Sequence, residues 1–171
     1  MVSTEIRIAG VVNDSIVDGD GYRFTIFTQG CPHHCPGCHN PQTHPFDGGR
    51  ITDIDTLDRQ IAENPLLSGV TFSGGEPFCQ PEPLTALARK LHQRALDIWI
   101  YTGYTLEQLQ ARQEPAINAL LETADVLVDG PFHQEERDLT LAFRGSRNQR
   151  VIDMNATRLQ GHIVLKPVAD E

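Results

Sequence analysis

Short runs of β-forming residues alternate with helical stripes along the 171-residue chain. Residues 22–28, 69–73, 97–102 and 125–129 are rich in β-branched and aromatic side chains and lack a helical period, so each predicts a strand. Apolar residues at helical spacing fall between these runs, around 54–61, 84–95 and 105–121. This alternation predicts an α/β fold with a mostly parallel sheet and outer helices.

Local signals mark where the helices begin and end. Thr52 or Asp53 is expected to cap the helix that starts at Ile54, and Pro65 follows its end. Thr105 and Gln108 have the spacing of a capping box, in which the two side chains close the first helical turn. Pro115 is expected to separate that helix from a second helical piece around 117–121.

The two ends of the chain depart from this alternation. Residues 6–12 suggest an edge strand, and residues 151–153 and 162–165 suggest two more strands with no strong helix between them. The sequence therefore predicts an incomplete barrel in a single domain over residues 1–171, with a core at about 5–153 and an unassigned tail.

A glycine turn with polar neighbours follows each of the four predicted parallel strands. The turns lie at 29–31, 73–77, 101–104 and 129–132. Because the carboxyl ends of parallel strands meet on one face, where ligands bind in such folds, we expect these turns to converge on one site.

The first turn opens a long loop in which Cys31, Cys35 and Cys38 have the spacing C-x3-C-x2-C. Three thiolates can hold three irons of a [4Fe-4S] cube and leave the fourth iron open to a small molecule, whereas electron carriers usually use four. Zinc is the alternative, since four nearby histidines could complete a tetrahedral site. A disulfide is less favoured, because pairing leaves one cysteine over. These histidines are His33, His34, His39 and His44.

Whether Cys79 is a cluster ligand distinguishes a catalytic cluster from an electron carrier. As a fourth ligand it would close the cube, but we interpret it as a buried, inert thiol, because free cysteine is among the most buried residue types.

The turn Gly74-Gly75-Glu76 suggests a binding site for a ligand ammonium. Two glycines allow a ligand to approach the main chain, whose carbonyls could bind the ammonium together with the Glu76 carboxylate. The alternative is a tight strand-to-helix turn with an acid at a helix N-terminus. Asp129 ends an apolar strand, so it points either to the site, which we favour, or into a salt bridge. Thr102 or Tyr104 could contact a ribose or an adenine.

Composition narrows the class of protein. A formal net charge of -9 and the lack of a basic face disfavour nucleic-acid binding. No run near twenty apolar residues and no apolar signal core occur, so we expect a cytoplasmic protein with no membrane partner. Arg144, Arg147 and Arg150 fit a solvated turn or an anion or partner site equally well.

Several stretches together resemble the radical S-adenosylmethionine activases of glycyl-radical enzymes. Residues 18–23, 29–40 and 73–77 carry this resemblance. Residues 100–107, 125–132 and 143–150 narrow it to the activases of anaerobic ribonucleoside-triphosphate reductase. Two departures concern the cysteine loop: Gly37 stands where many superfamily members have an aromatic residue, and His39 where such activases often have tyrosine.

The resemblance implies a partial radical-SAM-type (β/α) barrel and an oxidoreductase. Its one [4Fe-4S] cluster would be bound by Cys31, Cys35 and Cys38, with S-adenosylmethionine at the open iron. Gly74, Gly75 and Glu76 would hold the amino group of that cofactor, and the backbone of residues 37–39 (Gly37, Cys38 and His39) its adenine.

The same resemblance implies a reaction. An electron from flavodoxin or ferredoxin would reduce the cluster and cleave the sulfonium, and the 5′-deoxyadenosyl radical would take a hydrogen atom from a glycine of the reductase. Activation of another glycyl-radical enzyme, such as pyruvate formate-lyase, is the nearest alternative. A non-catalytic zinc or electron-transfer module is the alternative from another class.

Overall fold

The computed structural model describes residues 4–170 and has a seven-stranded sheet with the strand order β3-β1-β2-β4-β5-β6-β7. The strands are β1 (Glu5–Ser15), β2 (Arg23–Thr28), β3 (Arg50–Asp53), β4 (Gly69–Gly74), β5 (Asp97–Tyr101), β6 (Val126–Asp129) and β7 (Arg150–Asp153). The helices are α1 (Ile54–Ala62), α2 (Pro81–His92), α3 (Leu106–Ala111), α4 (Pro115–Thr123) and α5 (Met154–Gln160). Short 3-10 turns are η1 (Pro41–Thr43), η2 (Pro77–Cys79) and η3 (Gln134–Glu136).

The four central strands, β2, β4, β5 and β6, run parallel, as the sequence predicts. β1 is antiparallel to both β2 and β3, and β7 is antiparallel to β6. The sheet is open, with β3 and β7 at its two edges. The α/β class is therefore confirmed, whereas the barrel curvature and the single domain stay predictions.

The helix caps explain why the elements begin where they do. The Asp53 carboxylate accepts a hydrogen bond from the Thr56 backbone N–H at 2.7 Å, so Asp53, not Thr52, is the cap of α1. At α3, the Thr105 hydroxyl and the Gln108 amide form both bonds of the predicted capping box. Pro115 opens α4 at its first turn, where a missing N–H costs nothing.

Successive side chains along the central strands point to opposite faces of the sheet, so the core has two parts. Ile98, Ile100 and Leu127 face the main cluster, which contains the buried residues of α1, α2, α3 and α4. Trp99 belongs to a smaller cluster on the other face, which is covered by Phe143 and the C-terminal segment instead of helices. The face without helices is thus left for loops and a pocket. In residues 4–170, no helix combines the length and the apolar character that crossing a membrane requires.

Four local expectations are corrected by the structure. β3 was not predicted, because its four residues directly follow the long loop and pair only with β1. Residues 162–165 form only an isolated bridge between Ile152 and Leu165, and α5, capped by Asp153, precedes them. Ala95 lies beyond the end of α2 with φ 61°, outside the helix that its spacing suggested.

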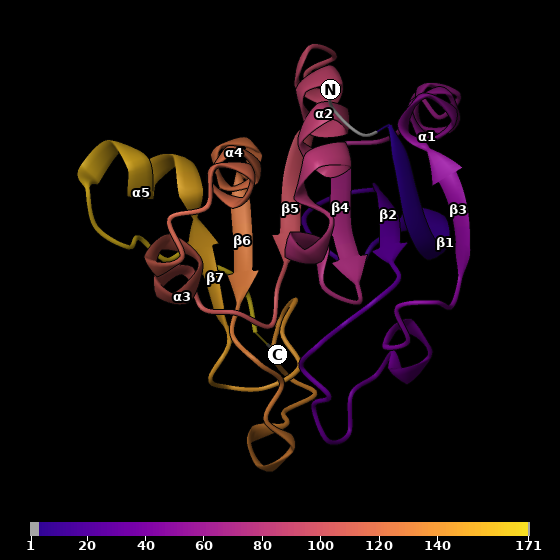
Figure 1. Cartoon of the computed structure of the whole chain (residues 1–171). Helices are drawn as coiled ribbons and strands as arrows, with labels where there is room; N and C mark the ends of the chain where they lie inside the picture. Colours follow the sequence, from indigo (N-terminus) through magenta and orange to yellow (C-terminus); the bar gives the residue numbers. More distant parts are fainter. Residues whose placement is uncertain (1–3, 171) are drawn as a thin grey trace.

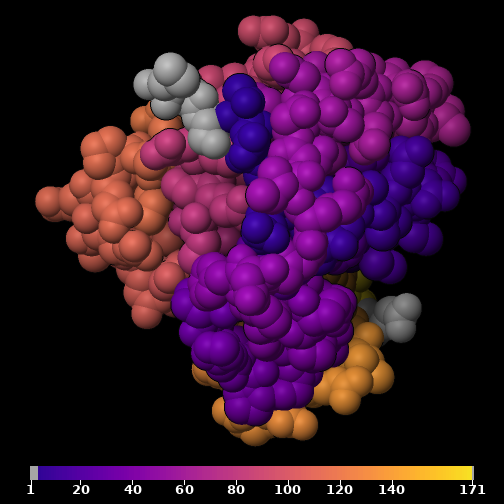
Figure 2. Space-filling view, turned by 45° about the vertical axis from the view of Figure 1, so that its right-hand side comes forward, coloured from indigo at the N-terminus to yellow at the C-terminus, as the bar shows by residue number. Residues whose placement is uncertain are grey.

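All four parallel strands point their carboxyl ends toward one edge of the molecule (Figure 1). The loop 29–49, which follows β2, and the loop 130–149, which follows β6, lie beyond this edge. Figure 2 shows the two loops against each other at the lower end of the molecule. Their contact is specific: the rings of His39 and Phe132 lie 5.3 Å apart.

Candidate functional site

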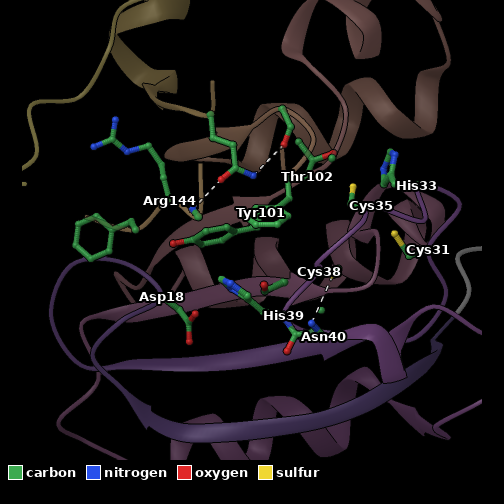
Figure 3. Close-up of a pocket in the computed structure, with 18 of the residues that line it drawn as sticks. Asp18, Cys31, His33, Cys35, Cys38, His39, Asn40, Tyr101, Thr102 and Arg144 are labelled. Atoms are coloured by element: carbon green, nitrogen blue, oxygen red, sulfur yellow. Dashed lines mark hydrogen bonds between the residues drawn. The ribbon is translucent and has the colours of Figure 1, made fainter. Parts of the chain in front are cut away.

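A cavity of about 540 Å³ lies at the carboxyl ends of the parallel strands, within the size range of small-molecule sites. Its lining comes from each of the strand ends that the sequence predicted to converge. The cysteine loop and the loop after β6 complete the wall (Figure 3). Predicted site residues among the lining are Cys31, Cys35, Cys38, His39, Gly74, Gly75 and Thr102.

The three loop cysteines all reach this cavity, and the structure gives each a different environment. Cys31 is buried, while Cys35 and Cys38 are half-buried. Burial raises the pKa of the Cys31 thiol to about 11, helped by the nearby Glu76 carboxylate. The Asn40 backbone N–H donates to Cys38 Sγ at 3.5 Å, a contact of the kind that tunes iron–sulfur clusters. A metal that binds Cys31 must therefore displace its proton.

Cys79 contradicts the sequence-based expectation of burial. It is exposed, at the end of η2, and it does not line the cavity. Only the three loop thiols share the cavity, so the donor set fits a cluster with three protein ligands.

Each histidine of the loop contacts a neighbouring side chain, although His33, His39 and His44 also line the cavity. His33 Nε2 lies 2.6 Å from Glu76 Oε1, and the rings of His34 and His44 lie edge to face, 5.8 Å apart. Within residues 4–170, no set of three or more His, Cys, Asp and Glu side chains already surrounds a common metal position. His33 Nε2 is bonded to Glu76, so as a zinc ligand His33 would have to offer Nδ1.

Gly74 and Gly75 form a turn that only glycine can make here. Gly74 has φ +98°, and a Cβ at this position would lie 2.6 Å from the Phe27 carbonyl carbon. The Gly75 N–H donates to the Thr28 carbonyl and the Glu76 N–H to the Gly30 carbonyl, both at 2.8 Å. The turn is thus fastened to the end of β2, directly before Cys31, and its main chain lines the cavity.

The Glu76 side chain is not available to a ligand, contrary to the sequence-based expectation for its carboxylate. Glu76 has no exposed surface and lies outside the cavity lining. It accepts hydrogen bonds from the Phe78 N–H, the Thr102 hydroxyl and the Gly103 N–H, besides His33. The glycine carbonyls of the turn remain as acceptors for an ammonium.

Thr102 reaches the cavity, but its hydroxyl is already bonded. Thr102 Oγ1 lies 2.9 Å from each Glu76 carboxylate oxygen and accepts the Tyr104 N–H. A contact to a ribose or adenine would thus use its methyl group or main chain.

Asp129 takes the second of its two predicted orientations. Arg150 Nε lies 2.9 Å from Asp129 Oδ1, and the Leu106 N–H donates to the other oxygen at 2.8 Å. Asp129 is 1% exposed and does not line the cavity. The structure places it in a salt bridge that joins β6, β7 and α3, so our preference for a site role is not supported.

The arginine cluster is also largely paired. Arg144 lies in the cavity wall and pairs with Asp170, while Arg150 pairs with Asp129 and Glu107. These ion pairs already bind the charges of Arg144 and Arg150 to carboxylates, so they do not support an anion site.

The cavity lining also includes residues that the sequence analysis did not assign to the site, among them Asp18 and Phe132. Asp18 lines the cavity and accepts a hydrogen bond from the Ser15 hydroxyl at 2.5 Å. Phe132 faces His39 across the two loops. Both residues lie in stretches that carry the resemblance, Asp18 in 18–23 and Phe132 in 125–132, and this is the signal that could have found them.

Comparison with protein families places the chain among iron–sulfur proteins. The family model described as a 4Fe-4S single cluster domain matches residues 17–152, most of the chain. The anaerobic ribonucleoside-triphosphate reductase-activating protein of Salmonella typhi is 38% identical over 80% of this chain and 91% of its own length. The protein of that name from Vibrio cholerae serotype O1 is 40% identical over 78% and 89%. The one from Enterobacteria phage T4 is 30% identical over 79% and 86%.

The chain belongs to the family of anaerobic ribonucleoside-triphosphate reductase-activating proteins, which confirms the resemblance found in its motifs. Among solved structures, QueE from Escherichia coli is similar at a TM-score of 0.50 and 16% identity, covering 73% of this chain and 70% of that one. This likeness concerns the fold alone.

Proposed function

We propose that this protein is a radical enzyme that activates anaerobic ribonucleoside-triphosphate reductase by generating a glycyl radical on it. The observation that carries the proposal is the cavity at the strand ends, where three thiols face a glycine turn and the fourth cysteine stays outside. The names of the relatives support the reductase, in preference to pyruvate formate-lyase, as the target.

Cys31, Cys35 and Cys38 would hold one [4Fe-4S] cluster, leaving its fourth iron for S-adenosylmethionine. When bound and reduced, the cluster supplies the electron that splits the sulfonium into methionine and a 5′-deoxyadenosyl radical, which takes a hydrogen atom from the target glycine. The carbonyls of Gly74 and Gly75 would accept hydrogen bonds from the ammonium of the cofactor, and the backbone around His39 would border its adenine.

Residues of the cavity wall would exclude water from the radical. Gly130 and Phe132 line the cavity at the start of the loop 130–149, and Leu141 and Phe143 line it further along the same loop. An apolar wall favours a radical reaction, because it keeps competing hydrogen donors and solvent away from the reacting atoms.

The reduction of the cluster requires an electron donor in the same compartment as the protein. Flavodoxin or ferredoxin would supply the electron, and the reduced thiols fit the cytoplasm.

The test is anaerobic reconstitution with iron and sulfide, followed by reduction with S-adenosylmethionine and the reductase present. We expect 5′-deoxyadenosine and, by electron paramagnetic resonance, a glycyl radical on the reductase. Formation of 5′-deoxyadenosine without a radical on the reductase would refute the target. Absence of both, with a complete cluster, would refute the reaction.

A further inference from the structure

One side chain connects the cysteine loop to the turns that border the proposed cofactor site. His33 lies between Cys31 and Cys35, and its Nε2 is 2.6 Å from Glu76 Oε1. The His33 side chain is 15% exposed and that of Glu76 is fully buried, so water competes little for this bond. Glu76 accepts hydrogen bonds from three other donors, so the His33 tautomer with a proton on Nε2 completes this set.

Glu76 is itself held by donors from two further places in the fold. The Phe78 N–H fixes one carboxylate oxygen at 3.0 Å from within the turn after β4. The Gly103 N–H at 2.8 Å and the Thr102 hydroxyl at 2.9 Å bind it from the end of β5. The carboxylate therefore joins the end of β4 to the end of β5, and His33 attaches the cysteine loop to that joint.

Packing fixes the ring of His33 as well as its nitrogen. The ring lies edge to face against Tyr104, with centroids 4.6 Å apart. A Cβ at Gly103 would lie 2.6 Å from His33 Nε2, so a glycine at this position leaves room for the ring. His33 thus has one orientation, set by two neighbours and one hydrogen bond.

We propose that His33 is a positioning residue, whose bond to Glu76 holds the Cys31–Cys35 arm of the loop in register with the Gly74-Gly75 turn. The inference rests on the proposed function for its consequence, because that register sets where the cluster would meet S-adenosylmethionine. Groups that orient metal ligands in this way typically change metal affinity or activity by about 10- to 100-fold when removed.

Three variants separate the hydrogen bond from the ring. His33→Phe keeps an aromatic ring against Tyr104 and loses the donor. His33→Gln loses the ring but places an amide N–H near the position of Nε2. The control is His34→Gln, a change of the same kind in the neighbouring residue, which has no bond to Glu76.

The first readout uses metal-free protein and is independent of any reaction. Alkylation of Cys31 by iodoacetamide at fixed pH, followed by mass spectrometry, reports how firmly the arm is held. We expect His33→Phe to speed this alkylation about 10-fold, because the arm loses a hydrogen bond that opposes its local opening, while His33→Gln and His34→Gln stay within about 3-fold of the wild type.

The second readout uses the reconstituted protein. Iron and sulfide are measured per chain, and the reduced cluster is titrated with S-adenosylmethionine by electron paramagnetic resonance. We expect His33→Phe to weaken the apparent affinity about 10- to 100-fold and His33→Gln to restore most of it. Equal affinities for His33→Phe and the wild type would overturn the proposal, as would a defect in His33→Gln as large as in His33→Phe.

Gly103→Ala keeps the proposal testable if His33→Phe does not fold. Its added methyl displaces the end of the His33 side chain while every loop residue stays unchanged. Faster alkylation of Cys31 in this variant supports the proposal, and an unchanged rate overturns it. If wild-type protein fails to cleave S-adenosylmethionine, the proposed function fails, yet the alkylation result still decides whether His33 holds the arm.

Discussion

Four glycines, Gly74 and Gly75 at the end of β4 and Gly10 and Gly161 elsewhere, allow the cost of backbone strain to be separated from the cost of steric overlap. Gly74 combines a left-handed φ of +98° with backbone atoms where its Cβ would be. Gly75 has only the overlap, since its Cβ would lie 2.9 Å from the Gly30 carbonyl carbon and closer to the oxygen. Gly161 has only the strain, with φ +76° and open space, and Gly10 has neither.

Alanine at each of these glycines therefore gives a graded series in the free energy of unfolding. We expect Gly10→Ala to be neutral or stabilising by about 0.5 kcal/mol, because alanine loses less entropy on folding. Gly161→Ala should cost about 1 kcal/mol of left-handed strain. Gly75→Ala should cost about 2 to 3 kcal/mol, because the obstructing atoms are main chain and cannot rotate away. Gly74→Ala should cost about 3 to 4 kcal/mol, the sum of both effects.

The assay is urea unfolding of the metal-free protein under reducing, anaerobic conditions. With a slope of about 2 kcal/mol per molar urea, Gly75→Ala should lower the midpoint by about 1 M and Gly161→Ala by about 0.5 M. The reasoning is refuted if Gly75→Ala unfolds at the same midpoint as Gly10→Ala, because the tight seam between β4 and the end of β2 would then not exist.

Three further changes test other parts of the structure. Asp129→Asn should cost about 2 kcal/mol in urea unfolding, because Arg150 loses its buried charged partner and keeps only the exposed Glu107. Its iron content should stay unchanged, and selective loss of iron would point to a site role instead. Cys38→Ala should abolish cluster assembly and Cys79→Ala should preserve it, as measured by iron and sulfide per chain; equal losses would favour an electron carrier with four ligands. Burial raises the pKa of Cys31 from 9.0 to about 11. In metal-free protein the rate of Cys31 alkylation should therefore rise about tenfold per pH unit from pH 7 to 10, and a plateau above pH 9 would contradict this burial.

The raised pKa of Cys31 also has a definite sign for stability. The folded state keeps the thiol proton to a higher pH than the unfolded state, whose pKa is near the ordinary 9.0. The contribution of this group to the stability of metal-free protein is therefore complete below about pH 9 and is lost as the pH rises toward 11.

Local sequence signals predicted those elements whose ends depend on neighbouring residues. The caps at Asp53 and Thr105 work through side chains within three residues of the backbone that they bind. The leucine stripe of α2 was also sufficient, because its leucines Leu84, Leu87 and Leu91 are all buried in one core cluster. β3 and α5 were missed, since β3 gains its partners only from β1, and α5 is short and depends on packing with β6 and β7.

The sequence predicted which strand ends border the cavity, but not all of the contacts that the residues make there. The order of strands and glycine turns was enough to bring the three thiols and Gly74 to one cavity. The direction of Glu76 was not predictable, because its donors come from loops distant in sequence, such as His33 and Gly103. For the same reason the sequence could not choose between the two orientations of Asp129, whose partner Arg150 is twenty-one residues away.

The most direct test of the account is whether a small molecule binds at an iron that the protein leaves free. Protein reconstituted without oxygen is reduced, and its electron paramagnetic resonance spectrum is recorded with and without S-adenosylmethionine. We predict four irons and four sulfides per chain and a spectrum that changes on adding the ligand. A complete cluster whose spectrum stays the same at saturating S-adenosylmethionine would contradict the central claim.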